Sequence, residues 1–362
     1  MTTNISAIRI ITFRRFVSVF VFVFLLAGAD SVCSAQIVES VGNRALGMGG
    51  AFVAVASDSS ATWWNPAGLA TGPFADVAIA HGVVDLKANV PARRDRVSFF
   101  AASAPMVGFS YYRLRITDIQ RSGAKGQPVV DREDTRAGVS VRSFSVSELG
   151  LTVVQSMLRG VHAGATLKYV RGTLRSSTGD AARPLSELLD SGEELDGGAA
   201  ENRFDLDAGV IGVAGPVRVG VVMRNIRALK FGDGGFTLPR QTRVGVALDI
   251  EKAGGPPLTL AVDADARTYT TASGDRRVIA AGVEQWLGSR RIGVRGGGRF
   301  NMVGAKERVA TAGASILVRT GMYVEGQVTR GGADAPFDSG SGRPEQSRGT
   351  ERGWGVGARV TF

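Results

Sequence analysis

The chain has 362 residues, of which 44% are apolar and 21% charged, and it contains 49 Gly, an unusually large number. The apolar fraction is ample for a core, which argues against disorder of the whole chain. One Cys and two His exclude a disulfide framework and a Cys-rich zinc site, and they leave little material for a metalloenzyme. The net charge of +10 permits an anionic partner without identifying it.

Residues 1–35 have the pattern of a cleaved secretory signal peptide. Three Arg precede a 14-residue apolar run, Phe16 to Ala29, and small residues lead to a cleavage site after Ala35. The alternative is an uncleaved transmembrane anchor, although a spanning helix needs about 20 apolar residues. Cleavage predicts an exported protein without Cys. Because it also removes three Arg and one Asp, it lowers the net charge to +8.

The segment 36–73 does not have the pattern of a membrane strand. Its first part, Gly42 to Ala56, consists mainly of Gly and small apolar residues. Asp58 is then a predicted helix start and Asn65 a second N-cap, with Pro66 at the first helical position. Trp63 and Trp64 lie between these caps, where they either pack the segment against its surroundings or contact a hydrophobic ligand.

The rest of the chain shows two-residue alternation in segments of about ten residues. The final segment is the clearest, because Trp354, Val356, Ala358, Val360 and Phe362 share one face. Counting such segments predicts fourteen strands, at 74–86, 96–104, 106–118, 143–156, 161–174, 203–213, 216–228, 239–252, 257–268, 277–287, 290–302, 307–318, 320–331 and 352–362.

The connections between these strands alternate in length. The join after every even strand is short, whereas the joins after odd strands are longer, with 303–306 as the exception. A soluble sandwich would also alternate along its strands, but it has no reason to keep this parity of loops. The pattern is typical of an outer-membrane barrel, with tight periplasmic turns and longer extracellular loops. The even count places both termini on the periplasmic side.

We therefore predict an all-β fold, a 14-stranded antiparallel transmembrane β-barrel over 74–362, in the outer membrane of a Gram-negative-type bacterium. A barrel of this width needs filling, so the segment 36–73 is expected inside it as a hatch, with a periplasmic tail as the alternative. Outer-membrane lipid is the expected surrounding, and the terminal aromatic Phe362 is the expected signal for the barrel-assembly machinery.

If the apolar faces meet lipid, the alternate residues line the lumen. These charged residues either bind an anionic head group, for which Arg has a suitable fork, or pair with one another in a wet interior. Alternatively, the excess of positive charge interacts with the phosphate groups of outer-leaflet lipids. The predicted lumenal charges are Arg218, Arg224, Arg243, Asp249, Asp263, Asp265, Glu284, Arg295, Arg299, Glu325 and Arg359.

Many glycines fall on the same predicted lumenal faces, where they would leave room for the inserted N-terminal segment. They are Gly164, Gly220, Gly245, Gly293, Gly297, Gly353, Gly355 and Gly357. The loop 175–202 is acidic and is expected to hold a short helix, as a lid, a partner-binding loop or an ordinary solvated loop.

Catalysis has little support in the sequence. His162 has no obvious Ser partner nearby along the chain, and no metal-ligand spacing occurs. Gly47 to Gly50 imitates part of a nucleotide loop but lacks its Lys and its strand-loop-helix context. The sequence therefore predicts a protein that is not an enzyme, with no cofactor, no metal and no nucleic-acid partner.

The run from Gly42 to Ala70 resembles the N-terminal signature of the FadL-like outer-membrane protein superfamily, closest to the PorV/PorQ family branch. Further similarity lies at 204–209, 219–225, 238–240 and 282–284, so the resemblance covers essentially the whole mature chain. The residues that match the hatch motif are Gly47, Met48, Gly49, Gly50, Asn65, Pro66, Ala67 and Gly68.

This resemblance implies a fourteen-stranded barrel with an inward-folded N-terminus. For the FadL branch it implies a channel for diffusion of long-chain fatty acids or other hydrophobic compounds, with lateral release through the wall. For the PorV branch it implies an accessory protein of a secretion system that binds secreted proteins without transport of its own. Fold cannot choose between these functions. Candidate lumenal ligand contacts are Trp63, Trp64, Arg218, Arg224, Arg295, Arg299 and Glu284.

Overall fold

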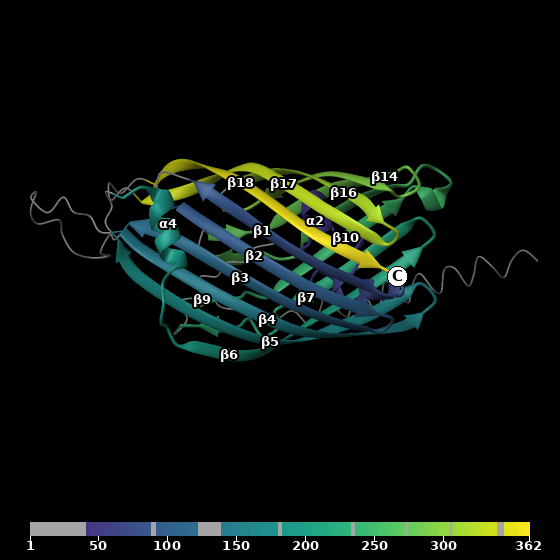
Figure 1. Cartoon of the computed structure of the whole chain (residues 1–362), viewed down its shortest axis with the longest axis horizontal. Coiled ribbons are helices and arrows are strands. Elements are labelled where there is room, and N and C mark those ends of the chain that lie inside the picture. The colour runs from purple at the N-terminus through teal and green to yellow at the C-terminus, as the bar shows by residue number, and fades with distance from the viewer. Residues whose placement is uncertain are drawn as a thin grey trace, which may run out of the picture. The chain divides into compact units, whose positions relative to one another are not determined.

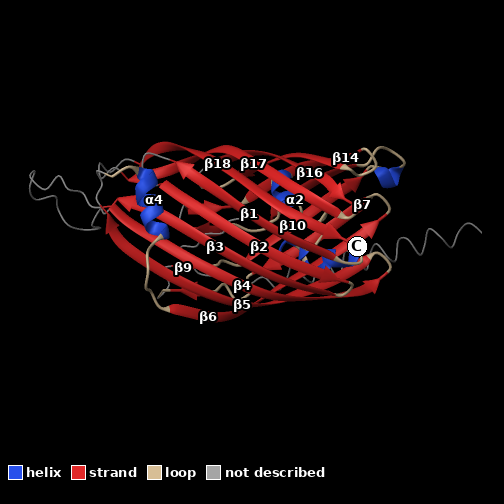
Figure 2. Ribbon diagram, in the orientation of Figure 1, coloured by secondary structure: helices blue, strands red, loops and turns tan. Residues whose placement is uncertain are grey.

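The computed structural model describes residues 41–87, 92–121, 139–179, 183–232, 236–271, 274–304, 306–338 and 344–362. The predicted signal peptide, 1–35, lies outside the described residues, as do 36–40. Fourteen antiparallel strands form a closed barrel in which consecutive barrel strands are neighbours, and β1 pairs with β18 to close it (Figures 1 and 2). The predicted fold is confirmed.

Each barrel strand overlaps one predicted segment. The strands are β1 (Asp76–Lys87), β2 (Ala92–Ala104), β3 (Val107–Arg121), β4 (Val139–Leu158), β5 (Val161–Gly179), β6 (Ala200–Ala214), β7 (Val217–Arg224), β10 (Gln241–Asp249), β11 (Leu258–Asp265), β14 (Val278–Leu287), β15 (Ile292–Asn301), β16 (Glu307–Arg319), β17 (Met322–Asp338) and β18 (Pro344–Thr361). The predicted loop 332–351 is wrong in part, because β17 and β18 stay paired as far as Asp338 and Pro344. These strand ends do not alternate between apolar and polar residues.

Two predicted loops contain small hairpins. The loop 229–238 holds β8 (Lys230–Phe231) and β9 (Phe236–Thr237), and the loop 269–276 holds β12 (Tyr269–Thr271) and β13 (Gly274–Arg276). The helix expected in the loop 175–202 is α4 (Leu185–Glu193), and a 3-10 turn, η2 (Glu251–Ala253), follows β10. In Figure 1, α4 lies at the end of the barrel opposite the C-terminus.

The N-terminal segment forms α2 (Asn43–Gly47), α3 (Ala61–Trp64) and the 3-10 helix η1 (Pro66–Thr71). Asn65 is the predicted N-cap of η1, since its side chain accepts a hydrogen bond from the Ala67 N–H, and Pro66 follows it. Asp58 does not cap a helix directly, because α3 begins three residues later. Its carboxylate instead accepts from the N–H of Ser60, at 3.0 Å. None of the helices in the described ranges is long and apolar enough to span a membrane.

The two faces of the barrel wall differ as predicted over most of its height. On β11, Val262 points outward and is 52% exposed, while its neighbour Asp263 points inward and is 1% exposed. The same order holds on β10, where Val246 is exposed and Arg243 buried. An exposed apolar outside with a buried polar inside is the reverse of a water-soluble fold and suits a wall that faces lipid.

We expect Val262→Lys to lower the free energy of unfolding from phospholipid vesicles by about 2–4 kcal/mol, because it places a charge on the lipid face near the middle of the wall. Val217→Lys, beside the turn that precedes β7, should cost about 1 kcal/mol or less. Chemical denaturation of both variants measures the difference. Equal losses in the two variants would contradict a membrane-facing wall.

Candidate functional site

Residues 41–72 lie inside the barrel and hydrogen-bond to several sides of its wall. The N–H groups of Phe52 and Val53 donate to one carboxylate oxygen of Asp263 on β11, at 2.7 and 2.8 Å. On β5, the Thr166 hydroxyl donates to the Thr62 carbonyl at 3.1 Å. On β16, the hydroxyl of Thr311 donates to the carbonyl of Gly47 at 3.0 Å. The wall thus satisfies backbone groups of a segment that has little regular structure of its own.

Glycines of the wall permit this close approach. A Cβ placed on Gly164 would lie 2.6 Å from the Ala67 nitrogen, and one on Gly220 would lie 2.6 Å from the Val53 carbonyl oxygen. Larger residues would therefore push the segment out of place. Of the predicted glycines, Gly245, Gly297, Gly355 and Gly357 also face the N-terminal segment, whereas Gly293 faces Trp286 and Gly353 faces Val84 and Thr329.

The Asn65 side chain ties the two parts of the segment together and to the wall. Its Nδ2 donates to the carbonyl of Val53 at 3.0 Å and to that of Val210 on β6 at 3.3 Å. Beside it, Gly209 leaves space for the amide. Among the other predicted motif residues, Met48 is fully buried, and Gly49 and Gly50 have positive φ. Their role as a hatch stays a prediction.

A buried ion network holds α2 against the wall. Arg44 donates to both carboxylate oxygens of Glu284 on β14, at 2.8 and 2.6 Å, and Arg295 on β15 donates to the same carboxylate at 2.7 Å. Arg44 also pairs with Asp58 at 3.2 Å, and Asp58 lies 3.5 Å from Arg359. Burial alone would raise the pKa of Asp58, but the charges of Arg44 and Arg359 outweigh it and lower that pKa below its ordinary value.

The predicted lumenal charges mostly contact protein groups. Arg299 pairs with Glu307 and Glu351, Arg243 with Asp265, and Arg359 with Glu325. Arg218 donates to the Thr71 hydroxyl at 2.7 Å. These contacts agree with the interpretation in which the interior charges pair with one another. Contact of any of them with a ligand stays a prediction.

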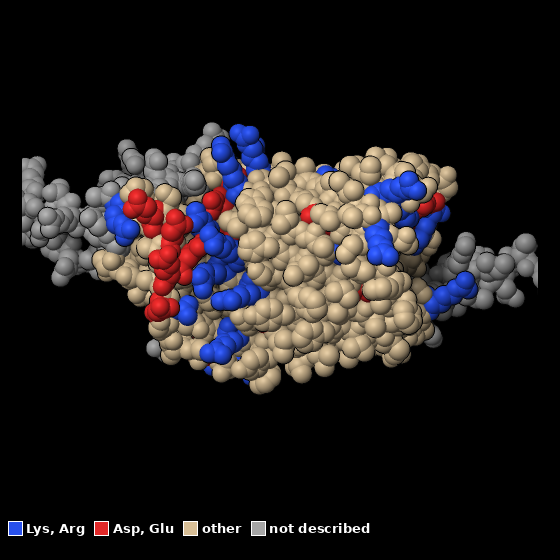
Figure 3. Space-filling model, in the orientation of Figure 1, with Lys and Arg blue, Asp and Glu red and all other residues tan. Residues whose placement is uncertain are grey.

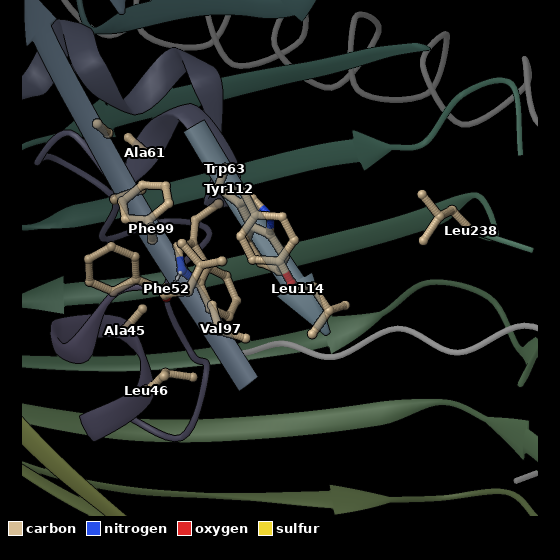
Figure 4. Packing of buried hydrophobic residues seen from close by; sticks show 14 of the residues in the cluster. Ala45, Leu46, Phe52, Ala61, Trp63, Val97, Phe99, Tyr112, Leu114 and Leu238 are labelled. Carbon is tan, nitrogen blue, oxygen red and sulfur yellow. Dashed lines mark hydrogen bonds between the residues drawn. The ribbon is translucent and has the colours of Figure 1, made fainter. Parts of the chain in front are cut away.

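The two tryptophans belong to the packing of the segment. Trp64 is buried and donates from Nε1 to the Val41 carbonyl at 2.9 Å. Trp63 packs against Trp64 and against Tyr112 of β3, with ring centroids 5.0 and 6.1 Å away. The guanidinium of Arg224 lies 3.2 Å above the Trp63 ring. Figure 4 shows Trp63 beside Tyr112, with Leu114 of the same strand pointing the same way.

On β2 to β5 most of the buried inner-face residues toward the end of the barrel that carries the longer connections are apolar, with Asp95 and Glu148 as charged neighbours. We call these apolar residues the apolar lumen cluster, and it comprises Val97, Phe99, Tyr112, Leu114, Ile116, Phe144, Val146 and Val170. Here the apolar side chains face the lumen, opposite to their side on β10 and β11. On β3, Leu114 and Ile116 point inward while Arg113 and Arg115 lie on the outer face, because the strand extends past the apolar outer band.

The hairpin β8–β9 packs onto this cluster. The Phe236 ring stacks on Phe144 with centroids 3.5 Å apart, and Phe231 lies 5.8 Å from the same ring. Gly172 on β5 makes room, since a Cβ there would lie 2.6 Å from the Phe231 ring. The hairpin is anchored by Glu201, whose carboxylate accepts from the Gly232 N–H at 2.6 Å. Sequence reasoning missed this contact, although two Phe flanking Gly-rich residues within a long loop were visible.

A second contact that sequence spacing missed involves His162. Antiparallel pairing across the β4–β5 turn places Ser156 opposite it, with its hydroxyl 2.9 Å from Nδ1. No group of three His, Cys, Asp or Glu side chains suited to hold a metal ion occurs within the described ranges.

Replacing the buried carboxylate should destabilise the barrel. Glu284→Gln leaves Arg295 buried without a counter-charge and leaves Arg44 with Asp58 alone, so we expect a loss of about 3–5 kcal/mol in the free energy of unfolding. The matched control Glu251→Gln breaks an exposed pair with Arg290 and should cost at most about 1 kcal/mol. Denaturant titration compares them. Similar small losses in both would show that the network does not hold the segment.

The barrel is similar to several solved structures. The toluene transporter TbuX of Ralstonia pickettii is 13% identical, with a TM-score of 0.58 over 90% of this chain and 99% of that one. The toluene transporter TodX of Pseudomonas putida is 12% identical, with a TM-score of 0.58 over 91% and 100% of the two chains. A FadL homologue of Pseudomonas aeruginosa is 11% identical, with a TM-score of 0.56 over 93% and 99%.

At these identities the likeness shows a shared fold, the FadL-like barrel, and it does not distinguish the PorV/PorQ branch. A search of curated proteins gave no match. A family profile, described as "F plasmid transfer operon, TraF, protein", matches residues 74–265, which is more than half of the chain. The chain therefore belongs to this TraF family, within the fold of the FadL-like barrels.

Proposed function

We propose that this protein is an outer-membrane channel through which hydrophobic small molecules diffuse. The observation that carries the proposal is the apolar lumen cluster, an inner wall lined by aromatic and aliphatic side chains at the end of the barrel with the longer connections. Ligand sites are typically concave and mostly apolar, with few polar groups. The shared fold with transporters whose names specify toluene supports the same class of ligand.

The hairpin β8–β9 would serve as the movable cover of this site. Its Phe231 and Phe236 rings occupy the surface of Phe144 that an aromatic or aliphatic ligand would contact. The hairpin has only two residues in each strand, so its displacement breaks few backbone hydrogen bonds. A ligand entering from outside would replace the two rings with its own apolar surface.

The cations next to the apolar lumen cluster, Lys168 and Arg224, favour an uncharged ligand. Lys168 on β5 lies 2.9 Å from Asp207 and donates to Asn225 at 2.6 Å, with Glu148 at 3.8 Å. Arg224 stacks on Trp63 and lies 3.9 Å from Asp207. Because carboxylates of the protein already compensate these cations, an aromatic hydrocarbon fits better than the carboxylate of a long-chain fatty acid. An accessory role in protein secretion has no specific contact in its favour.

Uptake of radiolabelled toluene by cells that lack other such channels tests the proposal. We expect uptake to rise on expression of the protein and to fall about tenfold in Phe144→Ser, which loses a buried aromatic contact surface. Phe109→Ser, on the outward face of β3, is the matched control and should transport normally. Expression without any gain in uptake, together with loss of surface-displayed proteins from a deletion strain, would favour the secretion role instead.

We further propose that the segment 36–73 acts as a hatch that closes the lumen to polar solutes. Its contacts with β5, β6, β11, β14 and β16 support this role, because they fill the interior from several sides.

Deleting Gly42 to Ala70 should make liposomes that contain the barrel permeable to small sugars. Swelling assays measure this, and heat-modifiable mobility in gels confirms that the barrel is folded. As a milder variant, Asn65→Ala removes the links to Val53 and Val210 and should cause a smaller leak. Unchanged permeability in a folded deletion variant would refute the hatch.

A further inference from the structure

Exposed arginines follow the outward side of the barrel at the end that carries the longer connections. Arg330 on β17, Arg352 on β18, Arg113 on β3 and Arg171 on β5 are exposed, and we call these four the outer arginine belt. They alternate along their strands with the buried residues Thr329, Glu351, Leu114 and Val170. Figure 3 shows Lys and Arg gathered along the edge of the broad uncharged surface at the end of the barrel near α4.

The belt directly follows a row of aromatic residues. The strand register aligns outward-facing residues of β2 to β6 in the order Phe100, Tyr111, Leu149, Tyr169 and Phe204.

Two residues further toward the rim, the register aligns Ser98, Arg113, Ser147, Arg171 and Asn202. On β17 and β18, beyond the β1–β18 pairing that closes the barrel, the row containing Trp354 is followed by the pair Arg330 and Arg352. From the middle of the wall toward the rim, the outer surface therefore shows an apolar band, an aromatic row and then cations. A bilayer presents its hydrocarbon, its interface and its head groups in the same order.

The charges of the belt are not compensated by the described part of the chain. Arg330 and Arg352 are direct cross-strand partners, and like charges in this position repel each other. Neither of them, nor Arg113 or Arg171, forms an ion pair or side-chain hydrogen bond with another described residue. An anion from outside the chain would remove this repulsion.

The neighbouring arginines show what such an anion does. At the rim, Arg94 of β2 pairs with Asp190 of α4 at 2.6 Å, and Arg96 pairs with Glu193 at 3.0 Å. The helix α4 lies on the outside of the wall, where Leu188 and Leu189 pack against Ile119 and Val141. Here the chain supplies its own carboxylates, whereas no carboxylate of the described residues pairs with the four arginines of the belt.

We propose that the outer arginine belt binds the phosphate groups of the phosphorylated glycolipid of the outer leaflet. Guanidinium groups offer two parallel donors that match phosphate oxygens. The Ser147 hydroxyl, which the register places between Arg113 and Arg171, can add a hydrogen bond to phosphate or sugar. The proposal rests on the membrane position of the barrel, and it is independent of what the lumen transports.

Binding of bisphosphorylated lipid A to the purified full-length protein in detergent tests this. We expect Arg330→Gln/Arg352→Gln to bind lipid A at least about tenfold more weakly than the unmodified protein, because two charge-assisted contacts are lost. The control Arg291→Gln/Arg319→Gln removes the same charge from exposed positions at the opposite end and should bind normally. Enzymatically dephosphorylated lipid A should bind all of them equally weakly.

Equal affinity of the belt variant and the unmodified protein, or equal weakening in both double variants, would overturn the proposal. Melting without lipid checks that each variant is folded. If the Gln variant does not fold, Arg330→Lys/Arg352→Lys keeps the charge but not the paired donors and should bind lipid A with intermediate affinity. Toluene uptake should be unchanged in the belt variant, so a failure here is distinguishable from a failure of the transport proposal.

Discussion

The close approach of the N-terminal backbone to the inner wall is the constraint on which the rest of this structure depends. A barrel of fourteen strands encloses more space than its own side chains fill. The N-terminal segment fills this space. At Gly164, Gly220 and Gly297 the wall has no side chain, so the inserted chain comes within van der Waals contact of the strand backbone. Asp263 then satisfies two of its N–H groups, so a segment with little helix or strand is held in one position.

The buried charges follow from the same insertion. Glu284 is 1% exposed, and it is stable as an ion because two guanidinium groups donate to it from opposite parts of the chain. Such a network adds little net stability compared with apolar packing, yet removing one member leaves the others uncompensated. It therefore fixes where α2 sits, which is a matter of specificity more than of total stability.

The surroundings of the wall change along the barrel axis, and the distribution of apolar and polar side chains changes with them. In the middle, the outside is apolar and the inside polar. Near the end that carries the longer connections, β3 reverses this order, with Leu114 inside and Arg113 outside. On β3 and β5 this reversal places residues of the apolar lumen cluster inside and Arg113 and Arg171 outside, whereas on β17 and β18 the belt residues Arg330 and Arg352 have the polar Thr329 and Glu351 as inward neighbours.

The sequence by itself determined the number of strands and their order, since alternation and loop parity are local features that a closed sheet must keep. It left the N-terminal segment either inside the barrel or as a periplasmic tail. It also indicated Asn65 as a cap and the glycines as space. Only the tertiary structure decided that Phe231 and Phe236 cover Phe144, that Ser156 meets His162, and that β17 and β18 continue to Asp338 and Pro344. These depend on pairing between distant strands and on the height at which each residue leaves the apolar band, and no short stretch of sequence records either quantity.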